Sequence, residues 1–510
     1  MNVVELADAT WERVGDYPDA LIFEDRSYSS GELRAMSHRM SGVLRDLGVE
    51  PGDRVAVMTP NCPEVGITYS ATWRLGAVTV PLLFLLALPE VAHILKDAEP
   101  KVVLVDPDFA SVVRNAIAGM ASPPKVVLIG DEADDGLCTG RLLAQAEPVS
   151  RAEAMEPDDL AGINYTSGTT GRPKGVMLTH GGMTFVSNAF METGDYVDDE
   201  VSLGALPLAH GYGILTQLVG MRLKAHGVMM RWFDPTQALR HIQEHRVKTF
   251  ASVPTMLVYL LHHPELDSFD VSSLERVGSG AAPCPLELMD AFEQRFGCTI
   301  YEGYGLTEST IACCTQRRSL PKVVGSVGIP IPGVTVKILD DGHNELPRGE
   351  LGEICVFGPT VTPGYYRLPE ATAEAVRDGW LHTGDIGRQD EAGNFYVVER
   401  KKDMIIRGGL NVYPRDIEEV LFEHPAVAEA AVVGRPDAEY GEEVVAFVVL
   451  KPGEAATAGD VIGFCRDQLA KYKVPKEVHF LDALPKNQVG KVLRRQLRQQ
   501  VAPVPAAESV

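Results

Sequence analysis

Short apolar, β-branched runs alternate with helical patterns from Arg54 onward. The runs RVAVMT, AVTVPL and KVVLVD are separated by amphipathic segments over 63–75 and 88–97. Strands that alternate with helices in this way are typical of βαβ units, whose strands pair in parallel and whose helices cover the sheet. The pattern therefore predicts a parallel sheet in the first part of the chain.

A second series of apolar runs follows further along the chain. It consists of GALPLAH, HGVMMRW, TFASVP and SLERVGSG, each followed by a helical pattern such as PLELMDAFEQRFG. After about Ile329 the pattern changes to apolar runs separated by glycines: VTVKILDD, GEICVFG and GNFYVVERK. These runs predict strands connected by hairpin turns. We therefore expect residues 1–401 to form a large layered α/β body with parallel-type sheets, closed by a small β-rich subdomain.

The chain beyond the charged segment 399–403 has a different pattern. A helix is expected over 414–423, strands over AEAAVVG and EVVAFVVL, and a second helix over 458–469. This predicts a small α+β C-terminal domain over 402–510, with the boundary near Lys402. The last residues, VAPVPAAESV, are expected to fray.

Composition narrows the class of protein. The chain of 510 residues carries 47 Lys or Arg and 70 Asp or Glu, a formal net charge of −23. An acidic surface repels phosphate backbones, so no nucleic-acid partner is expected. The eight Cys form no C-x-x-C pair, and we expect a reduced, metal-free set in a cytoplasmic protein.

The N-terminus carries acidic residues and no basic segment before an apolar run, so no signal peptide is predicted. The longest uncharged stretch, LGAVTVPLLFLLALP over 75–89, is too short for a spanning helix and contains two prolines. A buried strand with its exit loop is the favoured interpretation. The alternative is a surface that contacts lipid or an apolar ligand, which is compatible with peripheral membrane contact. The sequence does not indicate the oligomeric state.

The segment 162–175, GINYTSGTTGRPKG, has the composition of a phosphate-binding loop. Its small residues allow the backbone to approach an anion, its hydroxyls can donate hydrogen bonds, and its lysine can neutralise charge. It is not a Walker A loop, because Lys174 is followed by glycine. The candidate phosphate-binding residues are Thr166, Ser167, Gly168, Thr169, Thr170, Gly171 and Lys174.

The string YTSGTTGRPKG resembles the signature of the adenylate-forming superfamily, which includes acyl-CoA synthetases, peptide-synthetase adenylation domains and luciferases. The resemblance extends over almost the whole chain through GDRVAV, YGLTE, GWLHTGDIG, ERKKDMI, GGLNVYP and PKNQVGKVLRR. It implies that a carboxylate attacks the α-phosphorus of ATP to form an acyl-adenylate and pyrophosphate, and that CoA then displaces AMP.

The resemblance also implies roles for individual residues. Lys491 would stabilise the charge of the adenylation step, Thr307 would contact the α-phosphate, and Glu308 would help to hold Mg²⁺. Tyr304 would stack on adenine, opposite the backbone of Gly280, Ala281 and Ala282. Asp385 would bind the ribose hydroxyls with help from Arg400. Gly408 and Gly409 would line the CoA tunnel after the mobile C-terminal domain rotates about the hinge at Lys402.

The acyl pocket is expected near two residues. His210 resembles the family's acyl-pocket histidine, and no Asp lies within 209–212 to pair with an amino group. Gly303 stands where malonyl-CoA synthetases have an Arg, so amino acids and dicarboxylates are both disfavoured. A floor without a side chain leaves room for a longer apolar acid.

The predicted function is therefore an ATP- and CoA-dependent acyl-CoA synthetase, with a medium- to long-chain fatty acid as the favoured substrate. Aromatic or short monocarboxylic acids, and loading of an acyl carrier protein in trans, are the alternatives. A degenerate binding protein is disfavoured by the intact Lys174, Glu308, Asp385 and Lys491. A luciferase-like side activity shares the same motifs.

Overall fold

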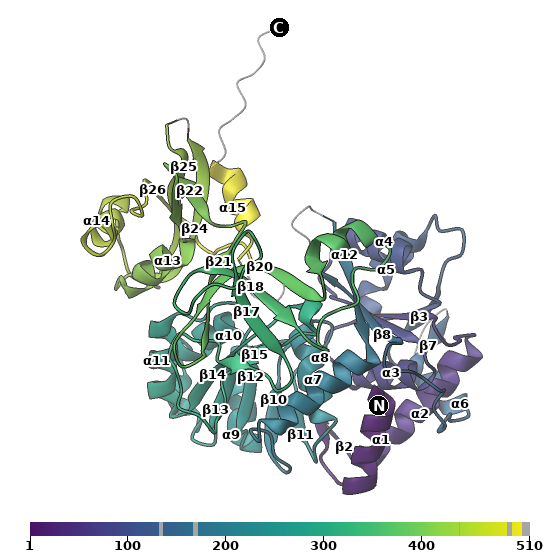
Figure 1. The fold of residues 1–510 in the computed structure, drawn as a ribbon. Coiled ribbons are helices and arrows are strands. Elements are labelled where there is room, and N and C mark those ends of the chain that lie inside the picture. The colour runs from purple at the N-terminus through teal and green to yellow at the C-terminus, as the bar shows by residue number, and fades with distance from the viewer. Residues whose placement is uncertain (132–135, 167–171, 438, 487–491, 502–510) are drawn as a thin grey trace.

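The computed structural model describes residues 1–131, 136–166, 172–437, 439–486 and 492–501. Two sheets stand side by side in the body, a smaller antiparallel sheet lies above them, and the C-terminal domain lies beyond that sheet (Figure 1). The expected large α/β body with a β-rich layer and a separate C-terminal domain is confirmed.

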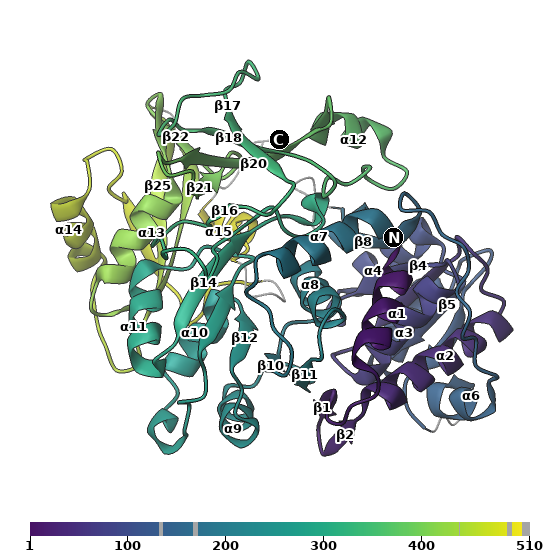
Figure 2. The same cartoon turned by 60° about the horizontal axis from the view of Figure 1, so that its bottom comes forward.

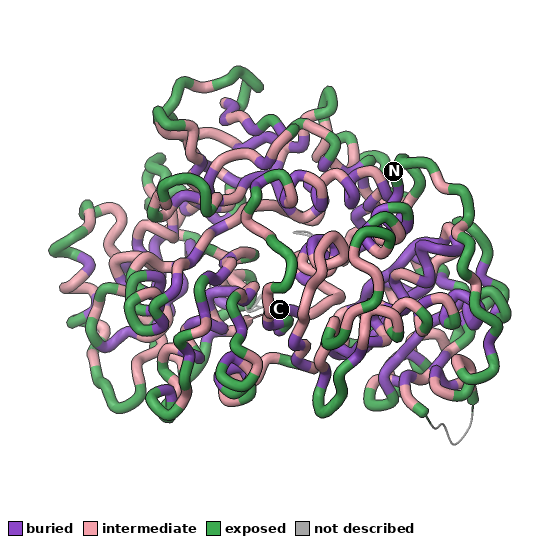
Figure 3. The backbone as a smooth tube through the Cα atoms, turned by 90° about the horizontal axis from the view of Figure 1, so that it is seen from below, coloured by how far each residue is buried: buried purple, intermediate pink, exposed green. Residues whose placement is uncertain are grey.

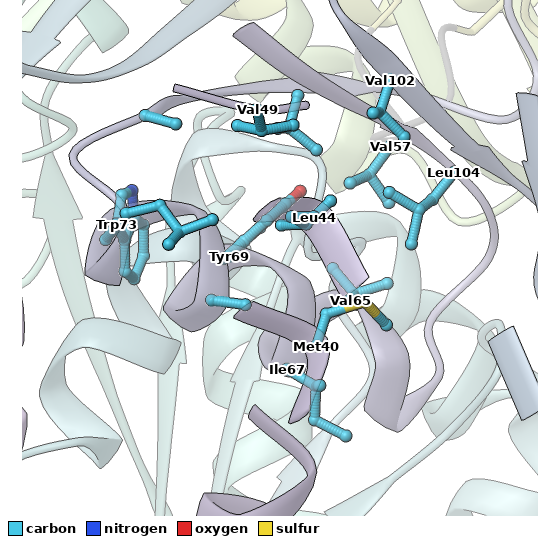
Figure 4. Packing of buried hydrophobic residues seen from close by; sticks show 14 of the residues in the cluster. Met40, Leu44, Val49, Val57, Val65, Ile67, Tyr69, Trp73, Val102 and Leu104 are labelled. Carbon is cyan, nitrogen blue, oxygen red and sulfur yellow. The ribbon is translucent and has the colours of Figure 1, made fainter. Parts of the chain in front are cut away.

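The first sheet has the strand order β7-β6-β5-β3-β4-β8-β9, parallel except for the last pair. Its strands are β3 (Arg54–Met58), β4 (Val78–Leu82), β5 (Val102–Val105), β6 (Lys125–Leu128), β7 (Leu137–Cys138), β8 (Leu160–Thr166) and β9 (Lys174–Thr179). The associated helices are α1 (Val3–Val14), α2 (Ser30–Asp46), α3 (Pro63–Arg74), α4 (Leu88–Ala98), η1 (Pro107–Phe109), α5 (Ala110–Ile117) and α6 (Thr139–Gln145). Tyr69 and Trp73 of α3 pack with Met40 and Leu44 of α2 beside this sheet (Figure 4).

The second sheet has the order β16-β15-β14-β13-β12-β10-β11-β1-β2. Its strands are β1 (Leu21–Phe23), β2 (Arg26–Tyr28), β10 (Val201–Gly204), β11 (His226–Met229), β12 (Thr249–Ser252), β13 (Arg276–Ser279), β14 (Thr299–Tyr304), β15 (Cys314–Thr315) and β16 (Ile329–Pro330). Its other elements are α9 (Pro235–His245), α10 (Pro254–Leu261), η2 (Leu266–Ser268), α11 (Leu286–Phe296) and η3 (Thr307–Ser309). Helices α7 (His180–Glu192) and α8 (Gly211–Gly220) lie between the two sheets (Figure 2).

The antiparallel layer contains β17 (Thr335–Leu339), β18 (Gly352–Phe357), α12 (Pro369–Ala375), β19 (Val376–Arg377), β20 (Trp380–Gln389) and β21 (Phe395–Arg400). The C-terminal domain contains β22 (Ile405–Arg407), β23 (Leu410–Val412), α13 (Pro414–Glu423), β24 (Val427–Asp437), β25 (Gly441–Leu450), α14 (Ala458–Gln468), β26 (Glu477–Phe480) and α15 (Arg494–Val501). Buried residues are concentrated inside each layered unit, and exposed residues follow the outer helices and loops (Figure 3).

One predicted strand is misplaced. GALPLAH was expected to be a strand, whereas β10 ends at Gly204 and lies upstream of most of that run. Pro207 cannot donate a ladder hydrogen bond, and the Asn61 side chain instead bonds the backbone of Leu206 and Leu208. The segment therefore leaves the sheet and leads to His210, the N-cap of α8.

The uncharged stretch 75–89 contains the buried strand β4, as the favoured interpretation expected. The segment after it is partly exposed: Leu85 in the loop is 56% exposed, and Leu88, the first residue of α4, is 42% exposed. Among the described residues, no helix combines the length and the apolar character needed to cross a membrane.

Candidate active site

A cavity of about 1260 Å³ extends from helices α1, α2 and α3 of the first sheet, past α8 and the second sheet, to the antiparallel layer and the C-terminal domain. Its wall contains many of the residues that the motifs singled out: Thr166, Lys174, His210, Gly280, Ala281, Gly303, Tyr304, Thr307, Glu308, Arg400 and Lys402. Ala282, Asp385, Gly408 and Gly409 are not part of this wall. Residues 167–171 and Lys491 lie outside the described residues.

Asp385 contacts two other candidate site residues, Tyr304 and Arg400. Its carboxylate accepts a hydrogen bond from the Tyr304 hydroxyl at 2.6 Å and pairs with Arg400 Nε at 2.7 Å. The Asp385–Arg400 pair follows from the register of β20 and β21. Burial, together with the Asp385 charge, raises the pKa of Tyr304, so the phenol remains a donor. The carboxylate therefore fixes Tyr304 and Arg400 at the cavity wall.

Glu308 and Lys174 converge on Tyr365, which the motifs did not single out. The Tyr365 hydroxyl donates to Glu308 Oε1 at 2.8 Å, and Lys174 Nζ lies 4.9 Å from the centre of the Tyr365 ring. Burial and the Glu308 charge raise the pKa of Tyr365. A cation and a carboxylate thus face the cavity around one aromatic ring, at the end of the phosphate-loop strands β8 and β9.

His210 is oriented by the start of α8. Its Nδ1 accepts a hydrogen bond from the backbone N–H of Tyr212 at 3.2 Å, as an N-cap does. Gly211, the next residue, lies so close to Ile311 and Thr307 that a Cβ there would lie 3.2 Å from Ile311. The start of α8 therefore packs directly against the YGLTE segment.

A slot runs along one face of the second sheet, beneath α8. Successive strand residues point to opposite faces, so the face that does not carry the Phe250 and Val277 core presents alternate positions. These positions are mostly small in the half of the sheet near Gly280: Gly204, Ala251, Gly278, Gly280 and Gly303. Apolar side chains of one buried cluster also line the cavity: Phe190, Leu215, Val219, Ala312 and Cys314.

Tyr212 from α8 lies against this glycine floor. A Cβ at Gly278 would lie 2.8 Å from the Tyr212 hydroxyl, and one at Gly280 would lie 3.2 Å from its ring. Burial raises the pKa of Tyr212. The glycines of β13 thus allow the Tyr212 ring to approach the sheet backbone closely. Alternating glycines in RVGSG were the sequence signal that could have indicated this.

The deep end of the slot is polar. Ser202, Thr249 and Arg276 are in register across β10, β12 and β13, one row beyond the glycine floor. Arg276 makes a paired contact with Glu200, and its guanidinium lies 5.8 Å from the centre of the Tyr196 ring. At about 3.3 Å per residue, Arg276 lies roughly 13 Å along β13 from Gly280.

Gly408 and Gly409 form the exposed turn of the β22–β23 hairpin, with φ angles of 59° and 79°. Lys486 and Leu493, on either side of 487–491, do line the cavity. In this arrangement the hairpin is therefore away from the cavity, while the residues flanking 487–491 contribute to it.

The fold and this set of residues define an adenylate-forming enzyme. The sequence model of the family described as "AMP-binding enzyme" matches residues 10–366, and that of the "AMP-binding enzyme C-terminal domain" matches residues 416–491. The chain belongs to the AMP-binding enzyme family. It is an AMP-forming acid–thiol ligase, which uses ATP, CoA and a small-molecule carboxylic acid.

Curated relatives and solved structures match over nearly the full chain. The long-chain-fatty-acid–CoA ligase of Bacillus subtilis (strain 168) is 36% identical and covers 95% of this chain and 92% of its own length. Feruloyl-CoA synthase of an Amycolatopsis species is 38% identical, with 96% and 97% covered. The crystal structure of ATP-bound MatB from Rhodopseudomonas palustris is 34% identical, covers 98% of this chain and 99% of its own, and has a TM-score of 0.89.

Proposed function

We propose that this ligase activates a monocarboxylic acid with a compact apolar body and a hydrogen-bonding group at its far end. The observation that carries this proposal is the slot itself. Its floor is glycine and alanine, Tyr212 packs against the Gly278 and Gly280 part of that floor, and a row of Ser202, Thr249 and Arg276 closes it. An aromatic ring fits the flat apolar part, and a distal oxygen would meet the polar row.

A medium- to long-chain fatty acid is the second candidate. The small floor residues, with Gly303 among them, favour it, and one similar relative is named as a long-chain-fatty-acid ligase. A long chain would, however, carry its apolar end onto the polar row, where methylenes would cover the Ser202 and Thr249 hydroxyls without hydrogen-bonding them. The relative named for a ring-containing acid, feruloyl-CoA synthase, is consistent with the first candidate.

Within this proposal, the residues predicted to bind ATP would contact its phosphates, its metal ion and its adenosine. Lys174 and Lys491 would neutralise phosphate charge, and the 166–171 loop would donate hydrogen bonds. The Glu308 carboxylate is a hard oxygen donor on the cavity wall, which fits Mg²⁺, and it would hold the ion together with phosphate oxygens. When bound, the ion supplies charge neutralisation. Tyr304 and Arg400 would face the adenosine, with Asp385 fixing both; direct ribose binding by Asp385 stays a prediction.

The second half-reaction depends on a rotation of residues 402–510 about Lys402, with Gly408 and Gly409 moving to the cavity to line the CoA tunnel. The exposed glycine turn supports this part of the proposal, because no heavy atom of the described residues lies within 4 Å of the position of a Cβ at Gly409. Cytoplasmic location remains a prediction of the sequence, and transfer of the acyl group to a carrier protein instead of CoA remains an untested alternative.

A panel of acids tests the acid class. We expect kcat/KM to be higher for cinnamic acids with a 4-hydroxyl group than for the same acids without it, with CoA and with a carrier protein as alternative acceptors. Thr249→Val should reduce that preference about fivefold, the effect of one hydrogen bond, and leave the non-hydroxylated acids unchanged. A kcat/KM that rises steadily with fatty-acid length, without a hydroxyl effect, would favour the second candidate.

The substitution Gly303→Trp separates the candidates further. An indole at the floor would exclude methylenes, each worth about 0.8 kcal/mol, so the loss of three or four would cost long acids roughly 2–3 kcal/mol in kcat/KM. The control is Gly303→Ala, whose Cβ would make ordinary contacts of 3.5 Å with Cys314 O and 3.7 Å with Thr315 Oγ1. A uniform loss for all acids with Gly303→Trp would contradict the long-chain candidate.

A further inference from the structure

Three side chains of different ligand chemistry meet between β18 and β20, outside the nucleotide-binding residues. They are Glu353 and Cys355 of β18 and His382 of β20. His382 Nδ1 lies 3.4 Å from Cys355 Sγ and 3.4 Å from Glu353 Oε2, and the three ligand atoms lie within 4.8 Å of one another. The antiparallel register pairs Cys355 with His382, and Glu353 is two residues along the same strand. The ladder therefore sets the Cys355–His382 pair, and a register shift between Glu353 and Cys355 brings Glu353 beside that pair although Glu353 itself is opposite Ile386.

The distances suit a metal ion better than a direct hydrogen bond between His382 and Glu353. An N–H···O bond is usually about 2.9 Å long, and 3.4 Å exceeds its normal range. Around a tetrahedral ion with bonds of about 2.0–2.3 Å, neighbouring ligand atoms are roughly 3.3–3.6 Å apart. Both measured separations fall in that interval.

Thiolate, imidazole and carboxylate together select a borderline cation such as Zn²⁺ rather than Mg²⁺. We propose that Glu353, Cys355 and His382 bind one divalent cation of this type, with solvent in the fourth position. The sequence offered no zinc signature because the ligands come from two separate strands. The proposal does not depend on the identity of the acid substrate.

The surroundings allow the site to form. The Cys355 side chain is fully buried, and those of His382 and Glu353 are 9% and 16% exposed, so the ion can enter from the carboxylate side. Lys401 Nζ lies 4.0 Å from Glu353, but its closer partner is Asp341 at 2.7 Å. Lys401 therefore keeps a counter-ion when Glu353 turns to a metal.

Binding releases one proton. Burial, and then the Glu353 charge, raises the pKa of Cys355 to about 12, so the side chain is a thiol before the ion binds. The S–H bond breaks, the proton passes to solvent, and the sulfur lone pair forms the bond to the metal. No redox change is involved.

The site adjoins the turn that leads to Asp385. Glu353 Oε1 accepts a hydrogen bond from the Gly384 N–H at 2.9 Å, and Thr383 Oγ1 donates to Ile354 O at 2.7 Å. An ion shared by β18 and β20 would hold this turn more rigidly. We therefore expect metal binding to raise the Tm and to change the KM for ATP.

Cobalt titration of the full-length, chelator-treated protein tests the site without relying on activity. We expect thiolate-to-Co²⁺ charge-transfer absorption that saturates at one equivalent, and one equivalent of Zn²⁺ retained after dialysis. Cys355→Ser should abolish the absorption. His382→Gln should weaken binding at least 10- to 100-fold, roughly the range seen when even an outer-shell partner is lost. Cys465→Ser removes another buried thiol and is the matched control that should retain the absorption.

The inference is overturned if the wild-type protein shows no such absorption, or if the absorption persists in Cys355→Ser. Cobalt bound at His241, Glu244 and His245 of α9, the other cluster with suitable spacing among the described residues, would lack a thiolate band and is distinguished in this way. Cys355→Val, which matches the apolar surroundings, replaces Cys355→Ser if the serine variant does not fold; it too must lose the band. The Cys355 variants should still form acyl-CoA, so a loss of the proposed function would be seen separately.

Discussion

At the scale of single residues, partners decide how each buried carboxyl group behaves. Asp385 is 3% exposed, yet it is compensated by Arg400 and by the Tyr304 hydroxyl. Glu302 on β14 is 5% exposed, and its Oε2 has no hydrogen-bond partner among the described residues. Burial raises the pKa of Glu302 to about 7, although Arg415 and Lys322 oppose the shift. The Asp385 carboxylate organises the site. Ionisation of the Glu302 carboxylate instead lowers the free energy of unfolding, and this effect depends on pH.

Glu302→Gln should stabilise the protein more at pH 8 than at pH 5. The pKa of Glu302 in the folded state lies above the ordinary value of about 4.5, so between about pH 4.5 and pH 7 the native state binds more protons than the unfolded state. The free energy of unfolding therefore falls as the pH rises through that window. The cost in the wild type is complete above about pH 7, at roughly 3 kcal/mol as an upper limit. Tm measurements across pH check this; an equal Tm difference at pH 5 and pH 8 would contradict it.

Lys491→Ala should slow adenylation about 10²- to 10³-fold, the effect of losing one preorganised transition-state donor. Thioester formation from supplied acyl-AMP should change little, since in the family the rotated domain removes this lysine from the second step. Pyrophosphate release and acyl-CoA formation are measured separately. An equal loss in both half-reactions would contradict the role of Lys491 in the adenylation step alone.

At the scale of elements, the turn of the β22–β23 hairpin combines exposure with a backbone conformation that favours glycine. Gly408 and Gly409 both have positive φ, a conformation that favours glycine. Within the part of the chain that the structure describes, no heavy atom lies within 4 Å of the position of a Cβ at Gly409. The exposed Ile406 and Leu410 flank this turn. The hairpin therefore has space here that is not used by its own domain.

Gly409→Leu should block thioester formation while acyl-AMP still forms, because its side chain would fill the CoA tunnel that we propose for the rotated orientation. Gly409→Ala is the matched control: it carries the same backbone strain of about 1 kcal/mol but little volume. We expect the alanine variant to retain most thioester formation, as measured with supplied acyl-AMP. If both variants lose both half-reactions alike, the turn is purely structural.

At the scale of the whole molecule, a few polar contacts hold the C-terminal domain against the body. The Arg415 backbone N–H donates to Glu399 at 3.2 Å, and its side chain donates to Val397 O on β21. Helix α13 also packs against α11. Burial raises the pKa of Glu399 to about 6. Polar contacts of this kind are consistent with domains that change their relative orientation.

Arg415→Ala should slow adenylation several-fold and leave thioester formation from acyl-AMP nearly unchanged. The lost hydrogen bond, worth about 1 kcal/mol, stabilises only the orientation in which Lys486 and Leu493 line the cavity. Glu419→Ala removes the partner of Arg415 within its own helix and serves as the control. A thioester rate that falls as much as the adenylation rate would argue against an orientation effect.

Local patterns in the sequence were sufficient to predict the order of the helices and strands and the class of enzyme. Buried strands are short β-branched runs, so β3, β4 and β5 could be read directly, and helix α13 begins and ends where it was expected. Phosphate chemistry requires particular residues in a contiguous loop, so 162–175 and YGLTE carried the family signature. Where Pro207 interrupts an apolar run, the same reasoning failed, because a missing donor and the distant Asn61 decide the backbone path.

Only the tertiary structure decided which distant residues share a site. Tyr365 reaches Glu308 across 57 positions, and Cys355 meets His382 through a strand register that no spacing reveals. The polar row of Ser202, Thr249 and Arg276 likewise exists only because three strands, far apart in the chain, pair in parallel and in register. Sequence determines each strand's alternation of faces, but packing chooses which faces enclose the substrate, since that choice depends on long-range contacts.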